Sequence, residues 1–548
     1  MKKKFSCGLI LLIVIIGSAF FIGSAEEEKD AKNLQMFSAV FKMLKNEFVD
    51  TLDSDFLIRR AIDGMVKSVD PHTVFFDEKE SKERVKVWQG IRYSGIGAYV
   101  AYKDSAAVIT GSIEGFGAQQ SDLRAGDIYL EIDGKSLRGK TLDETIALLR
   151  GDAETVVNIT VDRPHVGVVK KSVTRKQIVI KSIPFYTMLD SVTGYIQVQQ
   201  FLAGSDTQFI EAVKELKKNA KLKSIVLDLR DNIGGLVEQA VNCVNVFTPK
   251  NTVVIHLHGK ATDYNNVTLH EPLDTLMPLV ILTNSNTISA GEIFTGAMQD
   301  LDRAVVMGQK TFGKGLVQGT RFPYEGTSLY VTAARYYTPS GRCIQKRDYT
   351  HRYKDGKEEI FADTLKKVFY TKNGRKVFDI GGVQPDIKTD GLQPSVPIID
   401  ALNAASLIFN YATWLRNTQT IKNPAETFII TDTDFFNFMR FIEQGKYNFK
   451  IAEEEKLKEF EEIAKKNNTG KLFNSKYKQL YAEVAGSKKE MLLQNKELIK
   501  KALQNEIVLR YYYNSGLLKN SLTTDAEVIR AKGLLANQKE YSGILNKK

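Results

Sequence analysis

At 548 residues, the chain has room for about three or four domains. Its 43% hydrophobic and 26% charged residues exclude an intrinsically disordered protein. The net charge of +11 is spread over segments in which Lys and Glu are interleaved, so solvated helix faces explain it better than a nucleic-acid-binding groove does. We therefore expect a multidomain globular protein without a nucleic-acid partner.

The N-terminal segment has the pattern of a secretory signal. Basic residues Lys2 to Lys4 precede an apolar run over residues 9–21, and the small residues Gly23-Ser24-Ala25 follow it. The apolar run is short for a membrane-spanning helix, which favours cleavage after Ala25, although retention as a membrane anchor stays open. We expect an exported, periplasmic protein that is either soluble or tethered to the inner membrane.

Residues 26–90 follow a helical pattern, with apolar side chains at Phe37, Val40 and Leu44, and Asp70-Pro71-His72 interrupts it. This pattern predicts a helical region that packs on the domain after it.

The next segment, residues 91–175, is rich in strand and turn signals. A Gly-Ile-Gly loop leads into a strand, and Arg124-Ala125-Gly126-Asp127 opens a turn, a strand and a tight turn, before a short helix over 141–149 and a strand over 156–161. This order resembles a PDZ domain. The resemblance implies that backbone N–H groups of a loop bind a peptide's terminal carboxylate while the peptide adds as a strand. The loop residues are Ser94, Gly95, Ile96, Gly97 and Ala98. The alternative is a structural β-module that acts as a lid or spacer.

Two strand-to-helix turns follow in an α/β pattern. The first comes after a buried strand over 224–228 and contains Gly234 and Gly235, which either ease a tight turn or offer N–H groups to an anion. The second connects a strand over 279–283 to a helix over 289–300 that begins at Ser289. Functional sites in open α/β sheets lie at such neighbouring strand ends.

A serine and a lysine in this region predict nucleophilic catalysis. Ser289 stands at a helix N-terminus, which suits a developing oxyanion, and Lys314 lies 25 residues later between two glycines that permit close backbone approach. The alternatives are that Ser289 only caps its helix with Glu292 and that Lys314 is a solvated turn residue. A phosphate-binding loop is excluded, because Gly315 stands where that motif needs Ser or Thr.

Several motifs in order make the chain resemble the carboxyl-terminal processing proteases, the S41 family of serine peptidases. They are Asp228-Leu229-Arg230 with Asn232-Ile233-Gly234-Gly235, Ser289-Ala290-Gly291-Glu292-Ile293, Thr311-Phe312-Gly313-Lys314-Gly315-Leu316-Val317-Gln318, Arg335 to Arg342, and Gly382 to Ile387. The resemblance implies a multidomain α/β fold, with an S41 (ClpP/crotonase-like) protease core, an inserted PDZ domain and helical N- and C-terminal regions. Ile233, Thr287 and Ile288 depart from the family's usual residues, but none of them removes a catalytic group.

The resemblance also implies the site and the reaction. Ser289 would be the nucleophile, Lys314 its general base and Gln318 the residue that orients the lysine, while N–H groups of Ala290 and of either Gly234 or Gly235 would form the oxyanion hole. A serine hydroxyl needs a base, and a lysine amine serves only if burial lowers its pKa from about 10.4. The reaction would be acyl transfer to serine and then hydrolysis. A non-catalytic PDZ scaffold on a protease fold is the rival function.

No cofactor and no metal are expected. His256 and His258 alternate on a probable strand without a third ligand in a recognisable spacing, so we interpret them as ordinary strand residues. Cys243 and Cys343 stand in apolar patterns and are expected to be free thiols.

Residues 393–548 follow helical patterns and are expected to lie outside the protease core. The expected partners are proteins or peptides with accessible C-termini. The residues leave open an adaptor, a membrane tether through the N-terminal segment and a homo-oligomer. The predicted domain limits are 1–25, 26–90, 91–175, 176–392 and 393–548.

Overall fold

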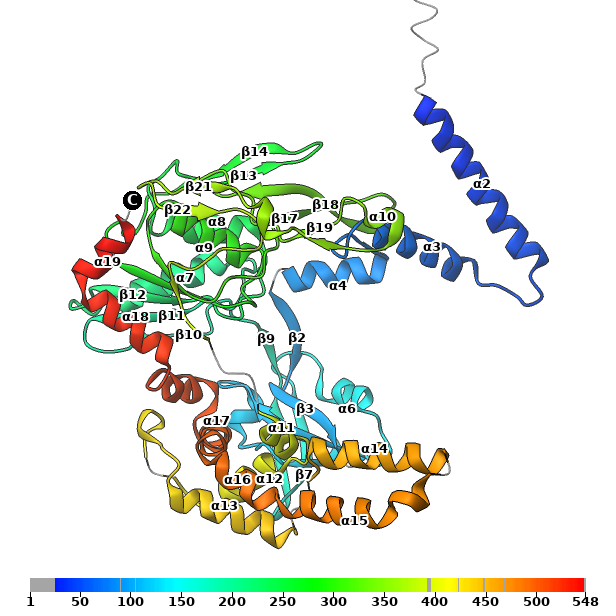
Figure 1. Ribbon diagram of the computed structural model, residues 1–548, viewed down its shortest axis with the longest axis vertical. Helices are drawn as coiled ribbons and strands as arrows, with labels where there is room; N and C mark the ends of the chain where they lie inside the picture. Colours follow the sequence, from blue (N-terminus) through cyan, green and yellow to red (C-terminus); the bar gives the residue numbers. More distant parts are fainter. Residues whose placement is uncertain are drawn as a thin grey trace, which may run out of the picture. The chain divides into compact units, whose positions relative to one another are not determined.

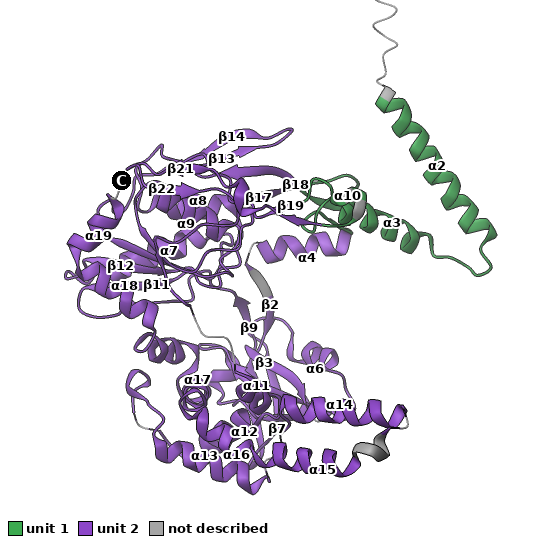
Figure 2. Ribbon diagram, viewed as in Figure 1, with its two compact units in different colours: residues 1–77, 320–331, 349–357 green, residues 78–319, 332–348, 358–548 purple. Residues whose placement is uncertain are grey.

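The computed structural model describes residues 25–88, 90–103, 105–391, 396–421, 423–446, 449–467 and 469–546 (Figure 1). The expected signal or anchor segment lies outside these residues, apart from Ala25. Across the described part of the chain, we find no helix with the length and apolar character needed to cross a membrane. The chain divides into two compact units, which Figure 2 colours separately.

The smaller unit contains residues 1–77, 320–331 and 349–357. Its elements are α2 (Ala25–Glu47), α3 (Ser54–Val69), β1 (Val74–Phe76) and α10 (Arg352–Asp355). The side chain of Asp53 caps α3, and buried Asp70 ends it by accepting hydrogen bonds from the N–H groups of His72 and Thr73. Phe37 and Val40, on the apolar stripe of α2, are exposed, and the packing of this region on the domain after it stays a prediction.

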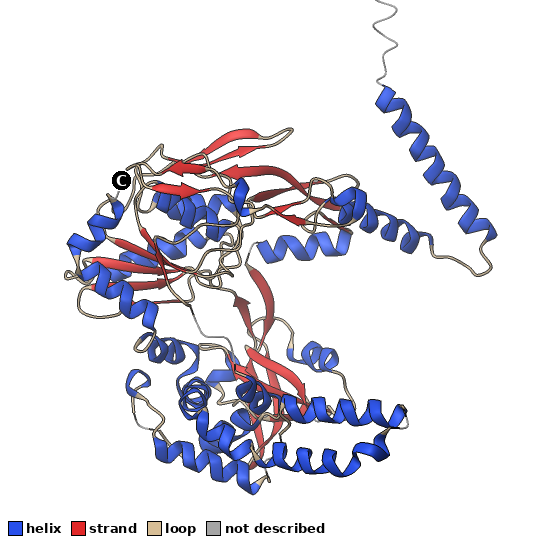
Figure 3. Cartoon of the chain, viewed as in Figure 1, coloured by secondary structure: helices blue, strands red, loops and turns tan. Residues whose placement is uncertain are grey.

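The larger unit begins with α4 (Glu78–Trp88) and contains a β-rich module (Figure 3). Its elements are β3 (Ala98–Lys103), β4 (Ala106–Ser112), α5 (Gly117–Gln120), β5 (Ile128–Ile132), β6 (Lys135–Ser136), α6 (Leu142–Leu149), β7 (Val156–Arg163) and β8 (Gly167–Thr174). The antiparallel sheet has the order β3-β4-β5-β7-β8, so β3 is an edge strand. The predicted helix over 141–149 is α6, and Thr141 and Glu144 form its capping box. The strand β2 (Ile91–Gly95) precedes this module in the sequence and β9 (Lys176–Val179) follows it. The two strands pair with each other, antiparallel.

The second part of the larger unit is built on a six-stranded sheet of order β10-β11-β12-β15-β16-β23. Its strands are β10 (Phe185–Met188), β11 (Thr193–Gln197), β12 (Ser224–Asp228), β15 (Leu279–Thr283), β16 (Val305–Gly308) and β23 (Ile387–Lys388). All neighbours are parallel except β10 and β11. The carboxyl ends of β12, β15 and β16 therefore lie side by side.

Helices cover both faces of this sheet, as a buried parallel sheet requires. Ile225 and Leu227 pack with α7 (Ser205–Lys217), α8 (Val237–Asn245) and α9 (Ala290–Asp300). Val226, which points to the opposite face, packs with α18 (Ala526–Ala536) and α19 (Gln538–Leu545) (Figure 1). The expectation that all residues from 393 onward lie outside the protease core is thus wrong for the last two helices.

A smaller sheet and hairpins complete this part. They contain β13 (Val253–His258), β14 (Asp263–Val267), β17 (Leu316–Arg321), β18 (Ser328–Tyr337), β19 (Arg347–Asp348), β20 (Glu359–Ile360), β21 (Val368–Tyr370) and β22 (Lys376–Phe378). The strand β13 pairs antiparallel with β14 on one side and with the end of β18 on the other.

The C-terminal helices have a separate core around Phe435, Phe438 and Leu503. They are α11 (Pro397–Ala404), α12 (Leu407–Thr418), α13 (Asp432–Gln444), α14 (Ala452–Lys466), α15 (Gly470–Gly486), α16 (Lys488–Gln494) and α17 (Lys496–Leu522). The helix α12 contacts the β-rich module, since Thr413 of α12 packs against Gly126 of the module. A Cβ added at Gly126 would be only 2.3 Å from the Thr413 methyl carbon. Cys243 and Cys343 are free, as expected.

Candidate active site

Ser289 lies where the carboxyl end of β15 turns into α9. It occupies the N-cap position of the helix with φ 57° and ψ −114°. L-residues seldom adopt this conformation, and it persists only when the surroundings impose it. Two contacts help to impose it: the Tyr336 hydroxyl donates to the Ser289 carbonyl at 3.4 Å, and the Ile288 N–H donates to the Asn232 carbonyl at 2.9 Å.

The fully buried carboxylate of Glu292 joins this turn to the lysine loop. Its Oε2 accepts from the backbone N–H of Ser289 at 2.9 Å and from that of Lys314 at 2.8 Å. Its Oε1 accepts from the Thr311 hydroxyl at 2.6 Å and from the Gly313 N–H at 2.7 Å. Burial raises the pKa of the Glu292 carboxyl, and these four hydrogen bonds oppose the rise. The predicted capping role of Glu292 is confirmed, and the same carboxylate also fixes the loop that carries Lys314.

Lys314 lies on the loop between β16 and β17, and its side chain is directed by Gln318. Lys314 Nζ donates to Gln318 Oε1 at 2.9 Å, and Gln318 Nε2 donates to the Thr332 hydroxyl at 3.1 Å. The flanking glycines allow the close approach that the sequence predicted. An added Cβ at Gly313 would be 2.6 Å from Lys346 Cβ, and one at Gly315 would be 2.9 Å from a backbone nitrogen.

The glycine turn after β12 packs directly on Ser289. An added Cβ at Gly234 would be 2.9 Å from Ser289 Cβ and 3.3 Å from the Ala290 nitrogen. Gly235 instead lies against the backbone of Phe201, and the Phe201 N–H donates to the Gly234 carbonyl at 2.8 Å. The structure thus places Gly234, Ser289 and Ala290 together.

The same glycine turn is anchored to the C-terminal helix α18 by a buried charge cluster. The Arg230 guanidinium contacts Asp228 at 2.6 Å, Asp525 at 2.9 Å and Glu527 at 2.8 Å. The Tyr195 hydroxyl also donates to Asp228, at 2.7 Å. Paired and hydrogen-bonded, these charges hold the start of the turn in one position.

Comparisons with known proteins identify the family and its domains. A model of peptidase family S41 matches residues 192–354, and a PDZ-domain model matches residues 108–163. A "Probable PDZ-protease, C-terminal helical domain" model matches 398–535, and an "Activating protease CtpB N-terminal domain" model matches 20–80. A "Probable CtpA-like serine protease" of Staphylococcus aureus is 34% identical over 394 residues, which are 70% of this chain and 76% of the relative. The chain belongs to peptidase family S41.

Two further proteins are similar to this chain. A "Carboxy-terminal-processing protease" of Bartonella bacilliformis is 33% identical over 350 residues, 62% of this chain and 79% of the relative. The solved photosystem II D1 C-terminal processing protease has 24% identity and a TM-score of 0.35, and the match covers 66% of this chain and 88% of that one. The predicted family and the predicted fold class, an S41 protease fold with a PDZ domain and a helical C-terminal region, are confirmed. The protein is a serine-type protease.

The PDZ domain of this S41 peptidase has an edge strand beside a helix. The edge strand β3 contacts α6, and the loop before β3 contains Ile96 and Gly97. The predicted loop residues Ser94 and Gly95 pair instead with β9, and Ala98 begins β3. A PDZ domain with this open edge fits the binding of a peptide or a C-terminus.

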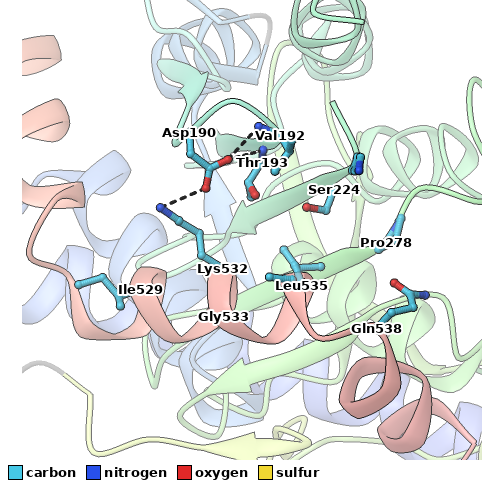
Figure 4. Close-up of a pocket in the computed structure, with 12 residues that line it drawn as sticks. Asp190, Val192, Thr193, Ser224, Pro278, Ile529, Lys532, Gly533, Leu535 and Gln538 are labelled. Carbon is cyan, nitrogen blue, oxygen red and sulfur yellow. Dashed lines mark hydrogen bonds and ion pairs between the residues drawn. The ribbon is translucent and has the colours of Figure 1, made fainter. Parts of the chain in front are cut away.

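A cavity of about 590 Å³ lies away from these residues (Figure 4). It is lined by residues at the amino ends of strands, such as Thr193 and Ser224, and by α18, where Lys532 pairs with Asp190 at 3.1 Å. Because Ser289 follows the carboxyl end of its strand, this cavity lies at the other end of the sheet from Ser289.

Two features of the site were not evident from the sequence. The Glu292 carboxylate was recognised as a helix cap, but its bonds to Thr311 and Gly313 cross about 20 residues. Arg230 was recognised as part of a family motif, but its ion pair with Glu527 was not predicted, because the two residues are 297 positions apart. An acidic residue within an apolar helical segment, Ala290-Gly291-Glu292-Ile293-Phe294, is the sequence signal that could have indicated the first.

Proposed function

We propose that this S41 peptidase is an exported endopeptidase that cleaves proteins near their C-termini with a Ser289–Lys314 dyad. The observation that carries the proposal is the shared contact of the two backbone N–H groups with Glu292 Oε2, which brings residues from separate loops to one point. The signal-like N-terminal segment supports export to the periplasm.

The reaction begins with proton transfer from the Ser289 hydroxyl to the neutral amine of Lys314. Gln318 accepts a hydrogen bond from this amine without adding a charge that would favour the ammonium form. The serine oxygen then attacks the peptide carbonyl, and the Lys314 ammonium gives its proton to the departing amine. Water, deprotonated by the lysine, hydrolyses the resulting acyl-enzyme.

We assign the oxyanion hole to the N–H groups of Ala290 and Gly235. The Ser289 N–H donates to Glu292, and the Gly234 N–H donates to Asn232 Oδ1 at 2.9 Å, so both are already used. The Ala290 N–H is the first of its helix and has no acceptor within it. Because the Gly234 carbonyl accepts from Phe201, the N–H of the same trans peptide, that of Gly235, points the opposite way.

The PDZ domain would select the substrate by its C-terminus. A chain that adds to the β3 edge would bind through its backbone and place its terminal carboxylate near the N–H groups of the Ile96–Gly97 loop. The carboxylate, rather than one particular sequence, would then be the feature that all substrates share.

The decisive experiment compares one unstructured protein substrate with a free and with an amidated C-terminus. We expect wild-type protein to cleave the free form with a KM lower by about tenfold, with product ends mapped by mass spectrometry. The Ser289→Ala variant should bind the substrate and release no product. Binding without cleavage by wild-type protein would instead support the scaffold function, and equal KM values would remove the PDZ domain's proposed role.

A further prediction concerns Gln318. Replacing it by Glu puts a carboxylate beside Lys314 Nζ and stabilises the ammonium form. We expect the rise of kcat with pH to move to higher pH, and kcat at neutral pH to fall by about tenfold. Gln318→Leu, the matched uncharged variant, should lower kcat without moving the profile. A Gln318→Glu profile that superimposes on the wild-type profile would contradict the role of Lys314 as base.

A further inference from the structure

A histidine pair on β13 meets a carboxylate across the β13–β14 hairpin. His256 and His258 alternate along the strand, so their side chains point to one face of the sheet. No third ligand was evident from sequence spacing. In the structure, Asp263, the first residue of β14, stands directly opposite His258 in the ladder. Pairing of the two strands thus supplies the ligand that the motif lacked.

The distances between these groups suit a metal ion. Asp263 Oδ1 is 3.0 Å from His256 Nε2 and 3.4 Å from His258 Nδ1, and the ligand atoms all lie within 4.8 Å of one another. Tetrahedral zinc bonds of about 2.0 to 2.2 Å keep neighbouring ligand atoms about 3.3 to 3.5 Å apart. Small side-chain rotations would therefore complete three bonds to one ion.

The orientation of His256 gives independent support. Its Nδ1 lies 2.9 Å from Asn265 Oδ1, and because an amide oxygen only accepts, Nδ1 carries the proton. The Nε2 atom then faces Asp263 Oδ1 at 3.0 Å, and the contact is favourable when Nε2 either carries a second proton or binds a metal ion through its lone pair. Metal-binding histidines are commonly fixed in this way by an acceptor on the other ring nitrogen.

We propose that His256, His258 and Asp263 bind a divalent transition-metal ion of the zinc class. Imidazole nitrogens suit Zn²⁺, Ni²⁺ and Cu²⁺, whereas Mg²⁺ and Ca²⁺ prefer sites made of oxygen ligands. The side chains are 42%, 63% and 65% exposed, so water completes the coordination and the ion exchanges with solvent. The bound ion joins the two strands of the hairpin at the end next to the connecting turn, residues 259–262.

Residues of β13 and β18 around the proposed site determine how tightly the ion binds and which part of the sheet it affects. Arg335 is exposed opposite His258 on β18, and its positive charge weakens cation binding. Leu257, between the two histidines, is buried on the other face opposite Tyr336, whose hydroxyl contacts the Ser289 carbonyl. The ion therefore stiffens the sheet that supports Ser289 without touching the dyad, and this proposal is independent of the proposed function.

Calorimetric titration of the full chain without an affinity tag, with Zn²⁺ as the probe, tests the site. We expect one ion per chain, a loss of affinity of at least about tenfold in His256→Ala and in Asp263→Asn, and about tenfold weaker binding in Asn265→Ala. Arg335→Ala should bind more tightly. His270→Ala removes an exposed histidine outside the cluster and is the matched control, with unchanged affinity. Mg²⁺ should produce no binding signal.

Thermal unfolding provides a second measurement, because an ion that binds only the folded chain raises Tm. Zn²⁺ should raise the Tm of wild-type and His270→Ala proteins and leave that of His256→Ala unchanged. Absence of Zn²⁺ binding to the wild-type protein would overturn the proposal and leave a proton-mediated ion pair between His256 and Asp263. Unchanged affinity in both His256→Ala and Asp263→Asn would also overturn it, by placing the ion elsewhere.

Discussion

Replacing Ser289 by Ala is expected to lower kcat/KM for a cleavable protein by at least about 10³-fold, because the variant lacks the hydroxyl proposed to form the acyl-enzyme. Lys314→Ala should cost a similar factor, since the serine then keeps its proton. The double variant should be no slower than either single variant, because residues that act as a unit lose their whole effect with the first change. Steady-state kinetics with mass-spectrometric product analysis measures all three.

Lys310 is the sharpest control for this prediction. It lies on the same loop, and burial together with nearby Lys366 lowers the pKa of its amine, so it is the rival candidate for the base. We expect Lys310→Ala to retain kcat within about threefold of wild type. If activity survives in Lys314→Ala and disappears in Lys310→Ala, the general base is Lys310 and the role proposed for Lys314 is wrong. Circular dichroism and Tm must show that each variant is folded.

Replacing Glu292 by Ala is expected to have the second largest effect. The change leaves the backbone N–H groups of Ser289, Gly313 and Lys314 without their acceptor, and each unpaired buried donor costs about 1 to 3 kcal/mol. We expect kcat to fall by at least about 10²-fold and Tm to fall as well, because both loops lose their common anchor. Glu292→Gln should be intermediate, since an amide offers one accepting oxygen instead of two. Thr311→Val removes one of the four donors and should have the smallest effect in the series. Wild-type kinetics in Glu292→Ala would show that this carboxylate does not position the dyad.

Protonation of Glu292 should make both kcat and the stability of the protein depend on pH. Because burial raises the pKa of its carboxyl, protonation begins at a higher pH than for an ordinary Glu, and activity should fall there as the acceptor is lost. Stability changes in the opposite direction. A raised folded-state pKa makes this group's contribution largest below its unfolded pKa, and the contribution is lost as the pH rises through the folded pKa. On acidification, kcat should therefore fall while this residue causes no fall in Tm, and Glu292→Gln should lack that limb of the kcat profile.

Local patterns made much of the fold predictable. The strand over 279–283 and the helix capped at Thr141 depend on neighbouring residues, so the sequence contained their full signal. The family motifs also identified Ser289, Lys314 and Gln318 as candidates. The resemblance also implied that Gln318 orients Lys314, and the hydrogen bond between them joins residues only four positions apart.

The amino-acid sequence by itself determined the family, the order of the modules and the chemical groups available for catalysis, because these depend on residue types and short spacings. Only the tertiary structure decided which helices cover the second face of the protease sheet, which loops share Glu292, and which carboxylate faces the histidine pair of β13. The physical reason is that these contacts join segments brought together by sheet order and helix packing. Apolar periodicity shows that a face is buried, but it does not name the partner that buries it.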